Sequence, residues 1–413
     1  MRYLYTLSVV IYTTVIKIAA LFNKKARKWV DGRKNLLKNI GTKIEKNQKY
    51  VWFHAASLGE FEQGRPVIEA FRKQFPVYKI VLTFFSPSGF EIRKNYSGVD
   101  FIFYLPVDTP KNTIKFLEIF NPEMVFFIKY EFWFNYINQI NKKNIPLFLF
   151  SVSFRPDQYF FKWYGNWFLR NLQKISWFFV QDVSSKQLLL HRNIKNCSVS
   201  GDTRFDRVLS ASIQKKSFPL VAEFSGNSRV FIAGSTWPYD EEFLIQFINQ
   251  KISGVKTIIA PHEIHLDRIS SFQSRINAKS IKFSEISTKN FAECDVLIID
   301  NIGILLHLYQ YAQIAYIGGG FGKSIHNILE AATFGIPVIF GPAFHKFKEA
   351  EDLISLGGAF PVTNYEEFDS VLQRFIVDSK LLETTSNICR KFVTDNSGAT
   401  DIIMQKIANN ISH

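Results

Sequence analysis

The stretch Val51-Trp-Phe-His-Ala-Ala-Ser-Leu-Gly-Glu60-Phe61 decides the fold class of this chain. Its apolar first part predicts a buried strand, and the small residues that follow predict a turn that presents the carboxylate of Glu60. A helix is expected next, over Arg65–Phe75, with Pro66 near its start. Because ligands of open α/β sheets lie beyond the carboxyl ends of the strands, Glu60 is a candidate catalytic residue. The same carboxylate could instead cap the helix and complement its dipole, so both interpretations stay open.

From residue 51 onward, short apolar runs alternate with helical patterns, which is typical of parallel, doubly wound α/β sheets. The alternation loosens through residues 210–227, which we interpret as a linker, and then restarts. We therefore expect two Rossmann-like domains, over 51–209 and over 228–413, facing a cleft of the kind in which small ligands usually bind. The predicted strands are Val51–His54, Ile80–Phe85, Phe101–Leu105, Met124–Ile128, Leu147–Ser151, Trp177–Gln181, Val230–Ala233, Thr257–Ala260, Val296–Asp300, Ile314–Ile317 and Val338–Phe340.

The N-terminal residues combine an apolar run with a basic segment. The chain has 413 residues and a net charge of +14, which suits a polyanion or an acidic membrane surface. Residues 24–49 hold ten Lys or Arg against two acidic residues, and the apolar run Leu4–Phe22 precedes them. We expect a membrane-anchor helix over 1–22, either spanning or shallowly inserted, and a basic juxtamembrane segment over 23–50. The positive-inside rule then places the basic segment and the rest of the chain in the cytoplasm. A long buried helix followed by a solvated basic helix is the alternative.

A glycine cluster, Ile317-Gly-Gly-Gly-Phe-Gly322-Lys-Ser-Ile-His326, lies in the second half of the chain. Glycines allow close approach to a ligand, and a helix predicted over Asn327–Phe334 would offer free N–H groups to a phosphate. The spacing fits neither the dinucleotide fingerprint nor a Walker A loop. A tight strand-to-helix turn without a ligand is the other interpretation. The three cysteines are too few and too scattered for a disulfide framework or a zinc site.

Five sequence motifs occur in an order that resembles the 3-deoxy-D-manno-octulosonic acid (Kdo) transferases, which add Kdo to a lipid A precursor. The resemblance covers essentially the whole chain and implies an α/β, GT-B glycosyltransferase fold. It implies that the domain over 51–209 binds the acceptor and the domain over 228–413 binds the CMP-sugar. It also implies transfer of Kdo from CMP-Kdo to lipid IVA, with inversion, in lipopolysaccharide core biosynthesis. The motifs are His54-Ala-Ala-Ser-Leu-Gly-Glu60, Lys129-Tyr-Glu131-Phe-Trp133, Ser200-Gly-Asp-Thr-Arg204-Phe-Asp206, Ala233-Gly-Ser-Thr-Trp237 and His326-Asn-Ile-Leu-Glu330.

The resemblance implies a role for each matching residue. Glu60 would be the general base, and Glu131 and Arg204 would stabilise the transition state. Glu131 could instead be an acidic partner of Lys129, and Arg204 could pair with a neighbouring aspartate. Contacts with CMP are implied for Pro261, His262, Asn301, Ile302, Gly303, Asn327, Ile328, Leu329 and Glu330.

The expected partners are CMP-Kdo, the lipid A precursor and anionic membrane lipids, with no nucleic acid. Arg65 and Arg155 are weaker candidates for contacts with the acceptor. The family works without a metal, and we expect no cofactor.

The chain departs from the commoner family pattern at two donor-site positions and one catalytic position. His262 stands where family members often have arginine, and Ile304 stands where they often have glutamate. Arg204 stands where they often have lysine, which keeps the charge. These departures affect individual nucleotide contacts, for which Arg268 or Lys323 could compensate.

Two other functions are compatible with part of this pattern. A GT-B transferase with a UDP-sugar donor in envelope biosynthesis would share the fold, although the motifs around Glu60 and Arg204 argue against it. A membrane-attached nucleic-acid-binding protein would explain the charge, but most of the basic excess is juxtamembrane and no nucleic-acid-binding motif is visible.

Overall fold

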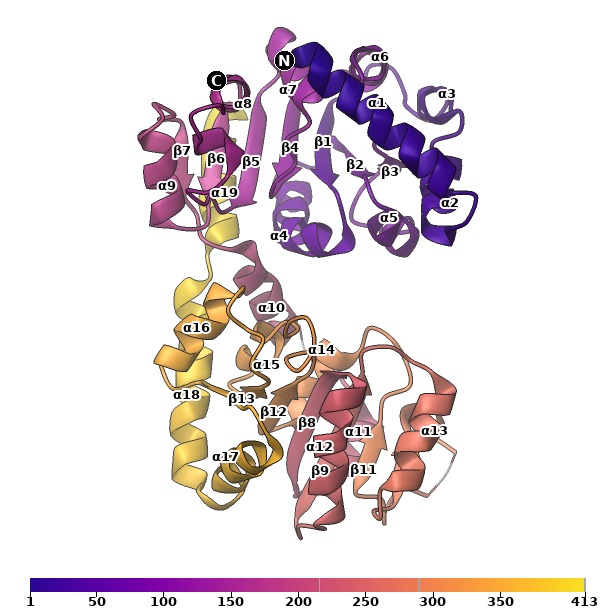
Figure 1. Cartoon of the computed structure of the whole chain (residues 1–413), viewed down its shortest axis with the longest axis vertical. Helices are drawn as coiled ribbons and strands as arrows, with labels where there is room; N and C mark the ends of the chain where they lie inside the picture. Colours follow the sequence, from indigo (N-terminus) through magenta and orange to yellow (C-terminus); the bar gives the residue numbers. More distant parts are fainter. Residues whose placement is uncertain (215, 289, 412–413) are drawn as a thin grey trace. The chain divides into compact units, whose positions relative to one another are not determined.

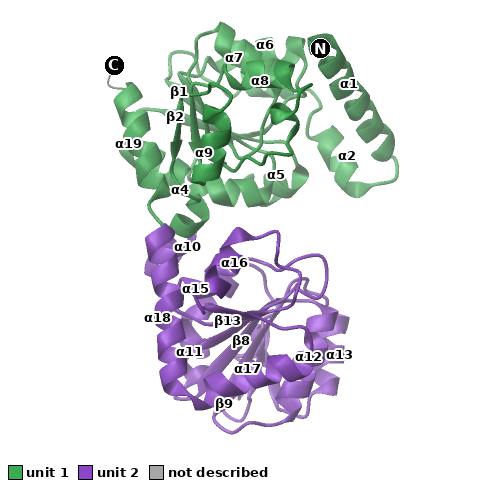
Figure 2. Cartoon of the chain, turned by 60° about the vertical axis from the view of Figure 1, so that its left-hand side comes forward, with its two compact units in different colours: residues 1–207, 397–413 green, residues 208–396 purple. Residues whose placement is uncertain are grey.

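The computed structural model of the chain describes residues 1–214, 216–288 and 290–411. These residues form two compact units (Figures 1 and 2). Unit 1 comprises residues 1–207 and 397–413, and unit 2 comprises residues 208–396. Within the described residues, each unit is built on a seven-stranded sheet in which every paired strand is parallel.

The sheet of unit 1 has the strand order β3-β2-β1-β4-β5-β6-β7. The helices of this unit cover both faces of the sheet (Figure 1). Its strands are β1 (Tyr50–Ala55), β2 (Lys79–Phe84), β3 (Phe101–Tyr104), β4 (Met124–Ile128), β5 (Leu147–Val152), β6 (Trp177–Val180) and β7 (Cys197–Val199). Its helices are α1 (Arg2–Ala19), α2 (Lys24–Asp31), α3 (Leu36–Gly41), α4 (Leu58–Gln74), α5 (Pro87–Arg93), α6 (Pro110–Phe120), α7 (Phe134–Lys142), η1 (Tyr159–Phe161), α8 (Asn166–Leu172), α9 (Val183–Leu190), the first half of α10 (Thr203–Ile213) and α19 (Ala399–Ile411).

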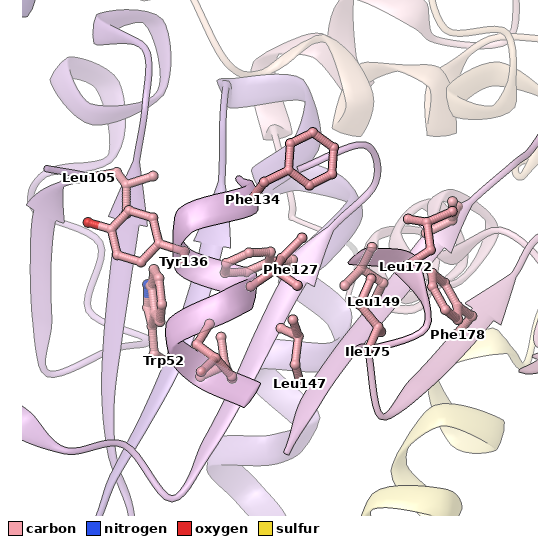
Figure 3. Close-up of a cluster of buried hydrophobic side chains, with 14 of the residues drawn as sticks. Trp52, Leu105, Phe127, Phe134, Tyr136, Leu147, Leu149, Leu172, Ile175 and Phe178 are labelled. Carbon is pink, nitrogen blue, oxygen red and sulfur yellow. The ribbon is translucent and has the colours of Figure 1, made fainter. Parts of the chain in front are cut away.

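Strand β1 shows why this sheet is buried on both faces. All six of its residues are buried, as expected for a central parallel strand. Trp52 packs with Phe127, Tyr136 and the other side chains of one core cluster (Figure 3), whereas Phe53 belongs to the cluster on the opposite face. His54 lies on the same face as Trp52, because side chains alternate along a strand.

The sheet of unit 2 has the strand order β10-β11-β9-β8-β12-β13-β14. Its strands are β8 (Arg229–Thr236), β9 (Val255–Pro261), β10 (Ser280–Lys282), β11 (Val296–Ile298), β12 (Ile314–Ile317), β13 (Val338–Phe340) and β14 (Ala359–Pro361). Its helices are the second half of α10, α11 (Pro219–Ser225), α12 (Pro238–Asn249), α13 (Leu266–Arg275), η2 (Phe283–Glu285), α14 (Leu305–Leu308), η3 (Tyr309–Tyr311), α15 (Leu329–Ala332), α16 (Lys348–Ser355), α17 (Tyr365–Val377) and α18 (Ser379–Asn396).

The structure confirms every predicted strand to within a few residues and adds three short ones. These are β7, β10 and β14, each of three residues at a sheet edge. Helix α4 begins at Leu58 rather than at Arg65, so Glu60 lies inside its first turn.

The division into units differs from the predicted domains. Two helices, α10 and α11, occupy much of the segment predicted as a linker, in which Lys215 lies outside the described residues. Helix α19 belongs to unit 1, although residues 228–413 were assigned to one domain. Its buried side chains Ile403, Met404 and Ile407 join the core cluster of α4 and β1, which is why the chain returns to unit 1 after unit 2.

Helix α1 is largely exposed. None of its residues is buried, and its apolar side chains Leu4, Leu7 and Ile11 are each more than half exposed. Among the described residues, no helix is both long and apolar enough to cross a bilayer. The membrane anchor over residues 1–22 stays a prediction.

The return of α19 predicts a local stability difference. Asp206 accepts hydrogen bonds from the backbone N–H groups of Gly398 (2.5 Å) and Thr400 (2.6 Å), which caps the helix. Because a lost cap costs about 1 kcal/mol, Asp206→Ala should make the amides of α19 exchange with deuterium roughly five- to tenfold faster. Asp401→Ala removes an exposed carboxylate from the first turn of α19 and is the matched control, with an effect below about twofold. Equal acceleration in both variants would contradict the capping role.

Candidate active site

Glu60 lies at the carboxyl edge of the unit 1 sheet, immediately after β1. It is the third residue of α4, and its Oε2 accepts hydrogen bonds from the backbone N–H groups of Ala56 (2.5 Å) and Ser57 (3.1 Å). This is the capping arrangement that the sequence left as an alternative to catalysis. The cap uses Oε2 and thereby fixes the direction of the side chain, and among the described residues no hydrogen bond to Oε1 is present.

Glu131 lies in the loop that follows β4. Its Oε2 accepts a hydrogen bond from Nε1 of Trp133 (2.5 Å) and lies 3.0 Å from Nε2 of His54. Lys129, at the start of this loop, has a positive φ of 66°. Residues other than glycine adopt this backbone conformation only at a cost in free energy. The backbone bond from Lys129 N–H to the Phe150 carbonyl (2.9 Å) holds this turn against β5.

The charge of Glu131 acts on Glu60. Burial, together with the negative charge of Glu131, raises the pKa of Glu60 to about 7. The N–H groups of Ala56 and Ser57 and the charge of Lys129 act in the opposite direction, but they do not outweigh burial. A carboxylate with a pKa near neutrality is suited to accept a proton in a reaction at that pH.

Arg204 lies at the start of α10, within unit 1. Its Nε and Nη2 contact Oδ2 of Asp202 at 2.8 Å and 2.7 Å, so the aspartate pairing considered from the sequence is present. The preceding residue fixes this helix start, since Oγ1 of Thr203 donates to the Gln63 carbonyl in α4 (2.6 Å). The guanidinium is therefore oriented by Asp202 and stays about a quarter exposed.

The two weaker acceptor candidates lie in different environments. Arg65 is paired with Glu69 (2.7 Å) on the exposed face of α4. Arg155 follows β5, is 70% exposed, and has an acidic neighbour, Asp157, at 3.9 Å. Arg155 is thus accessible to a ligand, whereas Arg65 forms an ion pair with Glu69.

A pocket of about 720 Å³ in unit 1 opens beside Glu131. Helix α1 forms part of its wall and is attached there by Tyr5, whose hydroxyl donates to the buried carboxylate of Asp108 (2.5 Å). Asp108 also accepts from the first N–H groups of α7, and burial raises its pKa to about 6. The lining is mainly aromatic and aliphatic, from Leu4, Val9, Tyr12, Trp29, Phe85, Phe132, Trp133, Phe134, Tyr159, Tyr164, Trp167 and Phe168.

Three rings meet at the carboxyl edge of the unit 2 sheet. His262, after β9, stacks on the ring of Trp237, after β8, with centroids 4.7 Å apart. It also stacks on His326, after the glycine cluster, at 4.2 Å, and Nε1 of Trp237 donates to Nε2 of His326 (3.0 Å). Burial is the main cause that lowers the pKa of His326 to about 4, so this ring is neutral at pH 7.

The remaining predicted nucleotide contacts differ in accessibility. Asn301, Ile302 and Gly303 form an exposed loop after β11, in which the Ile302 side chain is 90% exposed. Ile328 and Leu329, by contrast, are buried in the core.

The segment that follows the glycine cluster differs from the predicted helix. Helix α15 contains only four residues, Leu329–Ala332, instead of the span Asn327–Phe334. Asn327 caps its start through the N–H of Leu329 (3.1 Å) and donates from Nδ2 to Glu330 (3.2 Å). So short a helix has little dipole, which weakens the anion site predicted there.

Packing accounts for most of the glycine cluster. A Cβ at Gly318 would lie 2.3 Å from the Ser235 carbonyl oxygen, and one at Gly320 would lie 2.6 Å from the Gly341 backbone.

The two cations proposed to compensate for His262 differ in accessibility. Arg268 is held by Glu241 and the Thr236 carbonyl. Lys323 is exposed within the cluster. Among the described residues, no three His, Cys, Asp or Glu side chains gather closely enough to hold a metal ion.

Sequence reasoning quoted His54, Trp133, Trp237 and His326 in motifs but gave them no role. The structure brings the first two to Glu131 and the other two to His262. For His54, its position at the end of the predicted strand Val51–His54 was a usable signal, since side chains from neighbouring parallel strands converge at that edge.

Comparisons with known proteins agree on one family. The family model described as 3-deoxy-D-manno-octulosonic-acid transferase (kdotransferase) matches residues 32–207. A 3-deoxy-D-manno-octulosonic acid transferase of Rickettsia bellii is 27% identical over 421 residues, covering 98% of this chain and 99% of that protein. A bifunctional glycosyltransferase/methyltransferase of Fusobacterium nucleatum is 26% identical over 342 residues, or 79% of this chain, but the match spans only 53% of its length.

Solved structures resemble the fold. UDP-GlcNAc 2-epimerase from Neisseria meningitidis, bound to UDP-GlcNAc, gives a TM-score of 0.60 at 17% identity, covering 87% of this chain and all of the other. At that identity, the resemblance concerns the fold, which is GT-B-like with two Rossmann-like sheets.

The carboxylate pair predicts a titration that can be observed directly. In spectra of ¹³C-labelled glutamate carboxyls, the Glu60 signal, assigned by its loss in Glu60→Gln, should titrate with a midpoint near pH 7. Glu131→Gln should lower that midpoint, because it removes a neighbouring negative charge. Since the folded-state pKa is raised, the proton on Glu60 stabilises the fold fully below about pH 4.5, and this contribution is lost as the pH rises through about 7. A midpoint near 4.5, or one that Glu131→Gln leaves unchanged, would contradict the coupling.

Proposed function

Because the chain belongs to the family of 3-deoxy-D-manno-octulosonic acid (Kdo) transferases, we propose that it moves Kdo from CMP-Kdo to a sugar hydroxyl of a lipid A precursor. Family membership makes it a glycosyltransferase. The donor, the acceptor and the roles of individual residues are parts of the proposal.

One observation carries the choice of acceptor: a carboxylate pair lies beside a large apolar pocket in unit 1. Glu131 lines the pocket of about 720 Å³, and its charge acts on Glu60. A sugar that carries acyl chains needs both a carboxylate for its hydroxyl and an apolar surface for its chains. The carboxylate pair can serve the hydroxyl, and the aromatic lining of the pocket can contact the acyl chains.

In the proposed reaction, Glu60 is the general base. It takes the proton from the acceptor hydroxyl while that oxygen forms a bond to the anomeric carbon of Kdo. The bond from this carbon to the phosphate oxygen breaks on the opposite face, and CMP leaves with its electron pair, so the configuration inverts. Arg204, oriented by Asp202, would stabilise the charge that develops in the transition state, and Glu131 would position the acceptor.

We assign the donor nucleotide to the carboxyl edge of unit 2. The exposed ring of His262, which stacks on the rings of Trp237 and His326, offers a flat surface there. The loop 301–303 and the segment 327–330 supply backbone and polar groups on the same edge. Lys323 is the exposed cation of the glycine cluster and is suited to the phosphate of CMP.

We also propose that α1 lies in the surface of the inner membrane, at its cytoplasmic face. Its exposed apolar side chains would enter the acyl boundary, and the basic residues of 24–49 would meet anionic headgroups. Since α1 also lines the pocket, an acceptor that leaves the membrane would find the pocket at the membrane surface.

The function predicts a specific product. Purified protein incubated with lipid IVA, Kdo, CTP and a CMP-Kdo-forming enzyme should yield lipid that is heavier by one or more Kdo residues in mass spectra. Glu60→Gln should reduce the rate by about 10²-fold or more, because it cannot accept the proton, while CMP binding stays unchanged. The kcat/KM of the unaltered protein should rise with pH through about 7, as Glu60 ionises.

Two results would overturn this proposal. The first is an unchanged lipid mass in the presence of confirmed CMP-Kdo, and the second is near-normal transfer by Glu60→Gln. Calorimetric titration with CMP and with UDP tests the alternative donor, and a clear preference for UDP would favour a UDP-sugar transferase.

The membrane proposal predicts a loss of vesicle binding in a double variant, Leu7→Glu with Ile11→Glu. Both side chains are more than half exposed on α1, so the changes should not disturb the core. Binding to phosphatidylethanolamine–phosphatidylglycerol vesicles should weaken by about 10²-fold, because two apolar side chains no longer enter the bilayer. Val377→Glu, which changes a 77% exposed apolar residue of α17, is the matched control and should bind as before. Persistent binding of the double variant would show that α1 is not the membrane contact.

A further inference from the structure

A line of buried hydrogen bonds runs through unit 1 from the sheet to Glu131. Nε1 of Trp52 lies 2.7 Å from Oγ1 of Thr83, and this oxygen lies 2.8 Å from Nδ1 of His54. Nε2 of His54 then lies 3.0 Å from Oε2 of Glu131. The first three side chains have no exposed surface, and Glu131 is only 7% exposed. Buried polar groups of this kind are sensitive to the loss of any partner.

The direction of each hydrogen bond follows from the donors available. The indole of Trp52 can only donate, so Thr83 Oγ1 accepts there and its own proton is available for His54 Nδ1. An unprotonated Nδ1 leaves the proton of His54 on Nε2, which then donates to Glu131. In the opposite tautomer, the lone pair of Nε2 would face a carboxylate oxygen at 3.0 Å, two acceptors in a buried site.

A second contact of His54 would favour the alternative tautomer, in which Nδ1 carries the proton. The Thr83 carbonyl oxygen lies 3.1 Å from Nδ1 and could accept a proton from it. That arrangement would share the N–H of Trp133 between Glu131 (2.5 Å) and His54 Nε2 (3.1 Å). The shorter contact is to Glu131, which agrees with an Nε2 that carries its own proton.

His54 and Glu131 differ in how firmly the backbone holds them. His54 lies in β1, where it is in register with Thr83 of β2 and with Phe127 of β4. Glu131 lies in an irregular loop that begins with the positive φ of Lys129. The carboxylate therefore depends on side-chain contacts for its orientation. Both contacts fall on Oε2, and within the described residues no hydrogen bond reaches Oε1.

We propose that His54 is a positioning residue, which donates from Nε2 to Glu131 and thereby fixes the second carboxylate oxygen for the acceptor in the pocket. Thr83 and Trp52 serve this role by holding the imidazole ring in the required tautomer. The identity of the acceptor rests on the proposed function, whereas the orientation of Glu131 does not.

The tautomer can be measured on the intact wild-type protein. In ¹⁵N spectra of a sample labelled only in histidine, the His54 signals are assigned by their loss in a His54→Gln variant. We expect Nε2 to carry a proton and Nδ1 to accept one. A His54 with an unprotonated Nε2 would overturn the proposal, whatever reaction the protein catalyses.

Two variants separate positioning from a purely structural contribution. His54→Gln places an N–H donor near the former Nε2, whereas His54→Asn places its amide near the former Nδ1 and cannot reach Glu131. We expect Asn to lower the kcat of Kdo transfer by about 10²-fold and Gln to retain activity within about tenfold of wild type. Thermal midpoints and CMP binding, which uses unit 2, verify that both variants are folded.

The outcomes of this comparison are distinct. Equal losses of kcat that follow the thermal midpoints would mean that His54 serves stability alone, and the positioning role would be wrong. If the wild-type protein transfers no Kdo, the proposed function fails while the tautomer measurement still decides the role of His54.

A pair of variants at Thr83, Thr83→Val and Thr83→Ser, extends the test. Only the valine variant lacks the hydroxyl, so only it should lose the Nε2 proton signal and the activity.

Discussion

The parallel register of three strands in unit 1 is the constraint on which its candidate chemistry depends. β1 pairs with β2 on one side and with β4 on the other, so His54 lies between Thr83 and Phe127. A slip of one residue would turn His54 to the opposite face of the sheet, away from Glu131. The strands also deliver Glu60 and the 129–133 loop to the same edge, because all of them run in the same direction. Backbone hydrogen bonding thus sets the separation of the two carboxylates before any side chain is considered.

The environment of Glu60 combines two demands that usually conflict. A proton acceptor must be ionised when it acts, yet an apolar acceptor chain favours surroundings with little water. Burial and the charge of Glu131 move the pKa of Glu60 up to about 7, while the N–H groups of Ala56 and Ser57 oppose that rise. The result is a carboxylate that is half ionised near neutrality and is directed by the helix that it caps. The cap uses Oε2, so it is compatible with the proton acceptance that we propose for Glu60.

The sequence was most informative where a signal was local. Central strands such as Met124–Ile128 are continuous apolar runs, so their position and type were predictable. The edge strands β7, β10 and β14 were not predicted, since three residues carry no periodicity. The short α15 was overestimated because the apolar pattern of 328–332 reflects burial in the core rather than a long amphipathic helix.

Contacts between distant parts of the chain were beyond sequence reasoning. His54 and Thr83 are 29 residues apart, and their pairing appears only when the strand register is known. The bonds from Gly398 and Thr400 to Asp206 span more than 190 residues, and no local pattern near Ala399 indicates which unit α19 joins. The motif series singled out Glu60, Glu131 and Arg204 as candidates, but it could not show what orients each side chain.

The discontinuity of unit 1 has a consequence for biosynthesis. Unit 2 is a single uninterrupted segment, so it can acquire its native structure as soon as residue 396 has left the ribosome. Unit 1 is synthesised first, yet its core lacks Ile403, Met404 and Ile407 until the chain beyond unit 2 has emerged. During that interval, the apolar side chains of β1 and α4 that α19 later covers are exposed to solvent on the nascent chain. Chaperone demand during translation therefore falls on the earlier-made half of the molecule, and its maturation waits for the later-made half.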